Sequence, residues 1–525
     1  MRNKKLQVWL PLLFSVVMIL GMFYGYKLGD GQGFFSVKKQ TSLQQALETI
    51  KTYYVDTVNT DSLQAGAIQK MMSELDPHSV YFPPVESKQA LKDLEGRFEG
   101  IGIEYNIFDD TLNVVYVIPG GPSDVGGLRI GDKIIAVDNT SLTSKNLSPE
   151  NIKEKVRGIV GSVAVLQVLR NGEIKTFEVT RGSFPVSSID AAYMIDKNTG
   201  YIKLNKFTAT SYEDFMKSLE DLQKQGLQKL IFDLRDNGGG YMEDAIEICD
   251  EFLDADKLIV YTQGMNSKKH EYRCRRPGLF EKGELVILID ELSASASEVV
   301  AGAVQDWCRG TIIGRRSFGK GLVQQQFELN DGSALRLTVA RYYTPVGRSI
   351  QRPYDHGKKI YMDEISQRFL NGEVLYADSN KVHNGKTFQT VCGDSVYGGG
   401  GIMPSVFVPI DTFAFPLSIN RFFINGTVNS FVYHWYLKNK TAVDKYSSAT
   451  EFAEHFTQAD ALWNDFVTYV SNPENLQSLS VLQKNILQNR IQANLARFRW
   501  RNLGYIQVAN HNDLVVNAAL KKLKP

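Results

Sequence analysis

The chain has 525 residues, several times the usual length of one domain, so we expect more than one hydrophobic core. Its 59 Lys plus Arg nearly balance its 58 Asp plus Glu, and no basic run is interleaved with aromatics, which argues against nucleic acid as a partner. The 43% hydrophobic and 22% charged content argues against long disordered regions.

The first 30 residues predict a membrane anchor. Arg2, Lys4 and Lys5 precede an apolar stretch from Leu6 to Tyr26, close to the ~20 residues that cross a bilayer as a helix. A cleaved signal peptide is the alternative, but it would have a shorter apolar region and a small-residue cleavage site. We therefore expect residues 1–30 to be a cytoplasmic stub and an uncleaved anchor, with the bulk of the chain outside the cytoplasm.

Residues 31–95 have a helical pattern. The stretch SLQQALETIKTYYV at 42–55 places its apolar residues on one face, with Ser42 and Gln45 as a predicted capping box. The following DPHSVYFPP interrupts the helix. We interpret its lone His78 as a turn residue rather than a ligand.

The next two regions differ in their periodicity. Residues 96–185 hold short strands separated by Gly, Asn and Pro turns, which indicates a compact strand-rich module of roughly 85 residues. From 186 to 410, strands such as KLIFDL and ELVILID alternate with amphipathic helices such as SYEDFMKSLEDLQKQG. This alternation predicts a largely parallel sheet layered with helices.

Residues 411–525 are predicted to form a helical domain. Apolar residues recur there at spacings of three and four, and we interpret them as core packing rather than a cofactor site. They are Phe452, Phe456, Ala459, Trp463, Phe466, Val470, Leu487, Ile491, Leu495 and Phe498.

The four cysteines are scattered without a C-x-x-C pair, so no metal site is expected. Spacing does not tell which of them form a disulfide and which are buried free thiols.

The stretch LSASASEVVAGAVQDW at 292–307 raises the question of a nucleophile. Ser295 and Glu298 form a capping-box pattern, so a plain helix start explains the serine without any chemistry. However, a serine between a buried strand and a buried helix lies beside backbone N–H groups and the positive helix end, where an oxyanion is stabilised. We interpret Ser293 and Ser297 as local hydrogen-bonding and packing residues.

A serine nucleophile needs a base, and no histidine of the sequence lies in a suitable context. A lysine with a pKa lowered by burial is the alternative, and Lys320 lies between two glycines before an apolar strand. Gln324 follows four residues later, ~13 Å away in a straight strand, so a turn is needed to bring them together. The glycines of DLRDNGGG allow a close approach of backbone N–H groups to a substrate carbonyl.

Together, SASASE, GRRSFGKGLVQ, LRLTVARYYTPVGRSIQ, DPHSVYF and DLRDNGGG resemble the C-terminal processing peptidases, or tail-specific proteases. The resemblance covers about residues 42–353 and resumes at GGGGIMPSVFVPID. It implies a serine endopeptidase whose crotonase/ClpP-like layered α/β core carries an inserted PDZ domain, with helical regions at both ends. It also implies a place in the bacterial inner membrane, single-pass, with the catalytic portion in the periplasm.

The resemblance assigns roles to the candidate residues. Ser295 becomes the nucleophile, Lys320 the base and Gln324 the residue that orients the lysine, without any cofactor or metal. The oxyanion donors would be the backbone N–H of Ala296 and of a glycine in the NGGG turn, Gly240 or Gly239. In the PDZ module, the resemblance marks Gly100, Ile101 and Gly102 as peptide-binding, and Arg157 as a link to activation; a plain surface arginine is the alternative.

Two segments depart from the family pattern: the insertion at 354–397 and the long helical C-terminal segment. We expect a homo-oligomer, with an adaptor protein as a further partner, and these two segments leave the form of that assembly open. The favoured function is a membrane-anchored protease that selects polypeptides by their C-terminal tails. The alternatives are a catalytically silent PDZ scaffold, for which the set Ser295, Lys320 and Gln324 would have no use, and a different hydrolase on the same core.

Overall fold

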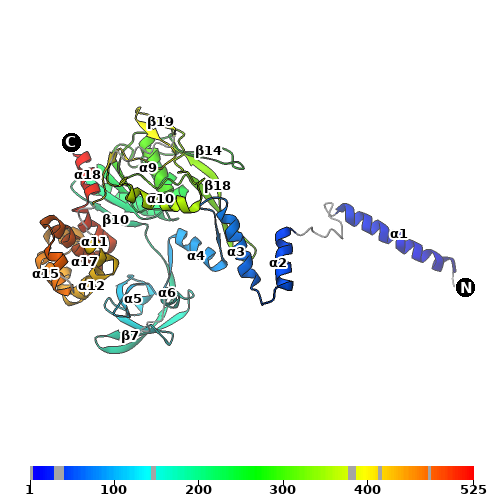
Figure 1. Cartoon of the computed structure of the whole chain (residues 1–525), viewed down its shortest axis with the longest axis horizontal. Coiled ribbons are helices and arrows are strands. Elements are labelled where there is room, and N and C mark those ends of the chain that lie inside the picture. Colours follow the sequence, from blue (N-terminus) through cyan, green and yellow to red (C-terminus); the bar gives the residue numbers. More distant parts are fainter. Residues whose placement is uncertain are drawn as a thin grey trace. The chain divides into compact units, whose positions relative to one another are not determined.

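The computed structural model describes residues 4–28, 41–142, 149–376, 386–411, 417–470 and 474–524. The chain divides into two compact units, Met1–Met71 and Met72–Pro525. Figure 1 labels the elements along the chain.

In the described part of the first unit, the regular elements are all helices. They are α1 (Lys4–Leu28), α2 (Ser42–Tyr53) and α3 (Thr60–Ser73), whose last residues enter the second unit. Among the described residues, no helix is both long and apolar enough to cross a membrane. The anchor predicted at 1–30 gains no support from this structure and stays a prediction.

Helix α2 differs from expectation in two ways. Its capping box is formed by Thr41 and Gln44, one residue before the predicted pair Ser42 and Gln45, which was wrong. The Thr41 side chain accepts from the Gln44 N–H, and the Gln44 side chain accepts from the Thr41 N–H. None of its residues is buried, so the predicted apolar face covers no core.

The strand-rich module predicted at 96–185 is built around one antiparallel sheet. Its sheet has the order β3-β4-β5-β7-β8, with β6 (Thr140–Ser141) beside β5. The five strands are β3 (Ile103–Phe108), β4 (Thr111–Val117), β5 (Lys133–Val137), β7 (Val163–Arg170) and β8 (Glu173–Thr180). The helices α5 (Pro122–Val125) and α6 (Pro149–Arg157) accompany the sheet, and β2 (Arg97–Gly100) pairs with β9 (Gly182–Pro185) where the chain enters and leaves the module.

The predicted parallel sheet is present from residue 189 onward. Its order is β10-β11-β12-β15-β16-β21, and all neighbours are parallel except β10 and β11. The strands are β10 (Ile189–Met194), β11 (Thr199–Leu204), β12 (Lys229–Asp233), β15 (Glu284–Ile289), β16 (Thr311–Gly314) and β21 (Val406–Phe407). One core cluster joins this sheet to α7 (Ser211–Lys224), α8 (Met242–Asp250) and α9 (Ala296–Asp306).

A second sheet, not expected from the sequence, is antiparallel and has the order β1-β18-β13-β14, with β17 beside β18. Its strands are β1 (Val80–Phe82), β13 (Leu258–Gln263), β14 (His270–Arg273), β17 (Leu322–Glu328) and β18 (Ala334–Tyr343). The chain before the strand-rich module thus supplies an edge strand, followed by α4 (Pro84–Glu95), to the sheet that carries Gln324. This sheet was missed because its strands come from distant parts of the sequence.

The insertion 354–397 contributes α10 (Lys358–Leu370), β19 (Thr387–Gln389) and β20 (Ser395–Tyr397). Arg368 of α10 donates to the carbonyl oxygens of Ser317 and Phe318, just before Lys320.

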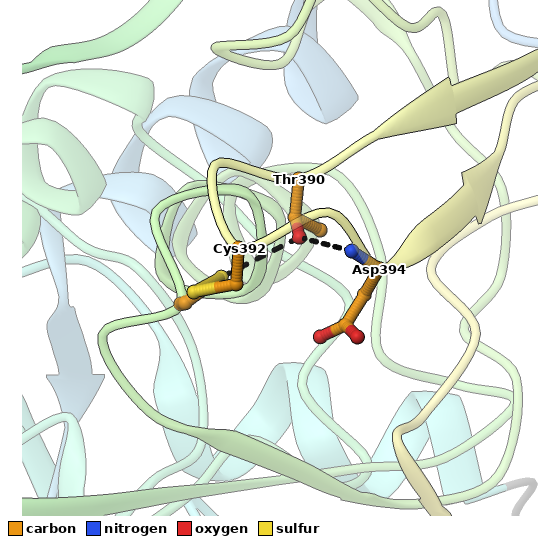
Figure 2. The surroundings of a disulfide bond; sticks show 4 residues. Thr390, Cys392 and Asp394 are labelled. Atoms are coloured by element: carbon orange, nitrogen blue, oxygen red, sulfur yellow. Dashed lines mark hydrogen bonds between the residues drawn. A yellow bond between two sulfur atoms is a disulfide. The ribbon is translucent and has the colours of Figure 1, made fainter.

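A disulfide joins Cys308, after α9, to Cys392 between β19 and β20 (Figure 2), whereas Cys249 and Cys274 are buried free thiols. The Thr390 hydroxyl lies beside this bond and accepts from the Asp394 N–H.

The C-terminal helices gather into a bundle (Figure 1). They are α11 (Leu417–Ile424), α12 (Thr427–Lys438), α13 (Lys440–Asp444), α14 (Ala449–His455), α15 (Ala459–Tyr469), α16 (Glu474–Gln477) and α17 (Val481–Asn510); α18 (Leu514–Leu523) follows them in the chain and is not part of the bundle core. The predicted apolar stripes lie in its core or pack against it. Val515, Val516 and Ala519 of α18 differ: they pack against the parallel sheet and so belong to the core of the α/β region.

Candidate functional site

Ser295 lies where strand β15 has ended and helix α9 begins. Its backbone has φ 56° and ψ −111°, a conformation that L-residues rarely adopt and that costs of order 1–3 kcal/mol. Such strain persists only when the surroundings fix the residue. Here the Ser295 N–H donates to Glu298 Oε2 at 2.8 Å.

The neighbouring serines are structural, which confirms their interpretation. Both are fully buried. The Ser293 hydroxyl donates to the Leu234 carbonyl at 2.8 Å, and the Ser297 hydroxyl donates to the Asn237 carbonyl at 2.8 Å. The two bonds fasten the Ser295 loop to the segment that leads into the NGGG turn.

Glu298 connects the loops that carry Ser295 and Lys320. The carboxylate is fully buried and accepts from the N–H groups of Ser295, Gly319 and Lys320 and from the Ser317 hydroxyl, at 2.5–2.9 Å. Burial raises its pKa, while these bonds act in the opposite direction. The sequence marked Glu298 only as a capping residue, and the long-range bonds gave no sequence signal.

Lys320 has the environment expected of a neutral base. Burial lowers the pKa of its ammonium to about 8, and the nearby charge of Arg336 acts in the same direction. Lys320 Nζ donates to Gln324 Oε1 at 3.0 Å, so the chain makes the turn that the contact requires. Glycines flank the lysine, and Gly319 has φ 89°.

Gln324 is fixed by residues far away in the sequence. Its Nε2 donates to the His78 carbonyl oxygen at 2.8 Å, and the His78 ring contacts the Tyr361 hydroxyl at 2.8 Å. Asp76 accepts from the N–H groups of His78 and Ser79, which fixes the turn. The turn interpretation of His78 agrees with this geometry, but sequence reasoning missed that its carbonyl reaches the candidate site.

The NGGG turn packs directly against the Ser295 loop. A Cβ at Gly239 would lie 2.7 Å from the Ala294 carbonyl oxygen, and one at Gly240 would collide with the Phe207 carbonyl, so both positions require glycine. The Gly239 N–H already donates to Asn237 Oδ1 at 2.9 Å, which favours Gly240 as the oxyanion donor. Ala296 is the first residue of α9, and an N–H at that position has no acceptor within its own helix.

One cavity of 720 Å³ brings the candidates together. Its lining includes Ser295, Ala296, Lys320, Gln324, Gly239 and Gly240. Tyr342, which the sequence did not single out, also lines it: its hydroxyl lies 2.7 Å from the Lys320 carbonyl oxygen and 3.1 Å from that of Ser295. Among the described residues, no group of acidic, His and Cys side chains is suited to hold a metal ion.

The residues assigned to peptide binding lie elsewhere, in the strand-rich module. A cavity of 340 Å³ is lined by Gly100, Ile101, Gly102 and Arg157, with β3 along it. Gly100 and Gly102 have φ 147° and 79°, which favour glycine. The Arg157 guanidinium lies 4.8 Å from the centre of the Phe98 ring, so Arg157 forms part of the wall of this cavity.

Family models match four parts of the chain. Residues 198–357 match peptidase family S41, and residues 114–170 match the PDZ domain. Residues 30–84 match the N-terminal domain of the activating protease CtpB, and residues 419–501 match a family of unknown function.

Individual relatives are similar to this chain over more than half of its length. The carboxy-terminal processing protease CtpB of Bacillus subtilis is 33% identical over 321 residues, 60% of this chain and 66% of that protein. The carboxyl-terminal-processing protease of Picosynechococcus is 34% identical over 294 residues, 54% of this chain and 70% of that protein. Among solved structures, the photosystem II D1 C-terminal processing protease is 24% identical, with 72% of this chain and 89% of that one covered and a TM-score of 0.36.

Proposed function

This chain belongs to the C-terminal processing peptidase family of serine proteases, and we propose that it cleaves extracytoplasmic polypeptides with Ser295 as the nucleophile. Its PDZ domain first binds the C-terminal tails of these polypeptides. The observation that carries the proposal is the single cavity lined by Ser295, Lys320 and Gln324. A scaffold that only holds partners would have no use for a lysine whose pKa is lowered to about 8.

The geometry supports a Ser/Lys mechanism. Neutral Lys320 takes the proton from the Ser295 hydroxyl as its oxygen attacks the peptide carbonyl, and the N–H groups of Ala296 and Gly240 stabilise the oxyanion. The protonated lysine then gives its proton to the leaving amine, which leaves an acyl-enzyme on Ser295. Water hydrolyses the acyl-enzyme, with Lys320 again acting as base.

The location is also part of the proposal. A membrane anchor at 1–30 and a catalytic portion in the periplasm agree with the charge pattern of the N-terminus. The disulfide between Cys308 and Cys392 supports an oxidising compartment, because such bonds are rare in the cytosol. Homo-oligomerisation and an adaptor protein stay predictions.

The test compares cleavage by the full chain, purified in detergent, with its Ser295→Ala and Lys320→Ala variants. The substrates are unfolded polypeptides that differ only in their last residues. We expect the intact chain to cleave them with a rate that depends on the tail, and each variant to lose at least about 10³-fold in rate. Cleavage by Ser295→Ala at the rate of the intact chain would contradict the proposal; no cleavage of any substrate by the intact chain would favour the scaffold.

A further inference from the structure

The helical bundle formed by α11 to α17 lies against the PDZ domain. The Tyr433 ring of α12 packs 5.2 Å from that of Phe108 at the end of β3, and its hydroxyl donates to Asn113 Oδ1. A Cβ at Gly131 of the PDZ domain would lie 3.0 Å from the Leu437 side chain of α12. Residues 419–501 of this bundle match a family for which no function is known.

A distortion in α17 adds a polar contact to this interface. Arg501 has φ 58° and ψ −145°, which breaks the helix at that residue. The Arg501 guanidinium forms a two-point ion pair with the Glu104 carboxylate of β3 and lies 3.4 Å from the centre of the Tyr116 ring. Charge-assisted bidentate pairs are among the stronger polar contacts.

The bundle also reaches the peptide cavity. Arg497, one turn before Arg501, is one of the residues that line the 340 Å³ PDZ cavity. A second cavity of 100 Å³ lies between the PDZ domain and the bundle and shares Glu104, Asn106, Val115 and Arg497 with the first. We call these two neighbouring cavities the groove; Asn429 and Asn494 of the bundle line its second cavity.

This groove has an excess of positive charge. Its first cavity is lined by one acidic side chain among the described residues, Glu104, against the basic Lys153, Arg157 and Arg497. Glu104 already forms an ion pair with Arg501. The Arg497 guanidinium lies 3.6 Å from the Glu104 carboxylate, and the Arg497 side chain is 48% exposed. The groove therefore favours a ligand that brings a further carboxylate to Arg497.

Strand geometry tells which part of a bound tail would reach Arg497. β3 is an edge strand, so a peptide adds beside it antiparallel, with its terminal carboxylate at Gly100–Gly102. Arg497 lies beside Glu104 and lines the cavity together with Asn106; these residues are two and four positions beyond Gly102, which corresponds to about 7–13 Å. We propose that the helical bundle completes the PDZ groove, and that Arg497 recognises an acidic side chain at about the fourth position from the C-terminus of the polypeptide. This inference rests on the proposed function, because it assumes that tails bind here.

The test measures binding of fluorescein-labelled peptides to the full chain carrying Ser295→Ala, which prevents cleavage. The peptides share one sequence and hold Glu, Gln or Lys at the fourth position from the end. We expect the Glu peptide to bind about fivefold more tightly than the Gln peptide at low salt, with a smaller ratio at high salt. Arg497→Gln reduces the ratio to within about twofold, and Arg497→Glu makes the Lys peptide the better ligand.

Arg499→Gln is the matched control, because Arg499 pairs with Asp444 inside the bundle and does not line the groove. It should keep the preference of the parent protein. An unchanged preference in Arg497→Gln, or no binding of any peptide, overturns the inference. Cleavage of unfolded polypeptides by the chain with Ser295 intact is measured in parallel: its absence counts against the proposed function, whereas cleavage with an unchanged preference counts against this inference alone.

Discussion

Ser295 and Lys320 donate their backbone N–H groups to the same oxygen atom, Oε2 of Glu298, at 2.8 and 2.9 Å. The Tyr342 hydroxyl lies within hydrogen-bonding distance of the carbonyl oxygens of the same two residues. The proposed nucleophile and base are thus held together through their backbones.

We expect Glu298→Gln to lower both stability and activity. The amide places an NH₂ group against donors that now bond a carboxylate oxygen, and leaving buried donors unsatisfied costs about 1–3 kcal/mol each. The free energy of unfolding should fall by about 2–4 kcal/mol, and kcat by more than tenfold at temperatures where the variant is folded. Denaturant unfolding and single-turnover cleavage measure the two effects. An unchanged kcat in the folded variant would contradict the positioning role.

The pH profile of cleavage should reflect Lys320. Because its pKa is lowered to about 8, the neutral fraction is about a tenth at pH 7 and rises with pH. We expect kcat/KM to increase from pH 6 and to level off above about 8. A profile that is flat between pH 6 and 9, with chemistry shown to limit the rate, would exclude Lys320 as the base.

The same pKa shift predicts a stability effect. The folded state binds the Lys320 proton more weakly than the unfolded state, so the ammonium destabilises the fold below pH 8, and this cost disappears as the pH rises toward 10.5. Lys320→Met should therefore raise the free energy of unfolding at pH 7 by about 1–3 kcal/mol. The gain should shrink between pH 8 and 10.5, which denaturant unfolding at several pH values measures.

Gln324 offers a test of how the lysine is tuned. Gln324→Glu places a negative charge where an amide oxygen now accepts from Lys320 Nζ, which favours the ammonium and should raise the Lys320 pKa. We expect the rising limb of the pH profile to move to higher pH by about 1 unit or more. Gln324→Ala is the control: it should lower kcat without that alkaline shift, and an equal shift in both variants would contradict the electrostatic explanation.

The disulfide should contribute measurably to stability. Cys308 and Cys392 are 84 residues apart, and a cross-link over such a loop typically contributes about 2–4 kcal/mol. A reducing agent should lower the free energy of unfolding of the parent chain by that amount. The double variant Cys308→Ser, Cys392→Ser should start lower and show no response; equal sensitivity of both proteins to the reductant would contradict the assignment.

Local patterns predicted much of the fold. Short stretches of sequence were sufficient for three features: the strand-to-helix junction at Ser295, the strands of the PDZ domain and the apolar stripes of the C-terminal bundle. Helix α18 was assigned to the wrong core because its apolar face looks the same whether a bundle or a sheet covers it. The disulfide partners could not be read for a related reason, since spacing does not report proximity.

Only part of the candidate site could be predicted, because a local sequence pattern does not report contacts with distant residues. Ser295, Lys320 and Gln324 have characteristic neighbours in the sequence, whereas Glu298, Tyr342 and the His78 carbonyl act through contacts with distant residues. A capping-box glutamate that also bonds a loop 22 residues later leaves no additional mark on the local pattern.

The contact between Gln324 and the His78 carbonyl joins residues 246 positions apart, with the whole PDZ domain between them. On the ribosome, Gln324 emerges only long after the turn that holds His78 has been made, and such non-local contacts form late in folding. Full activity would then require that both sides of the PDZ domain have come together. A chain that begins after residue 186 would carry the serine, the lysine and the glutamine, yet it would lack the acceptor that fixes the glutamine, so we expect such a fragment to cleave more slowly than the full chain.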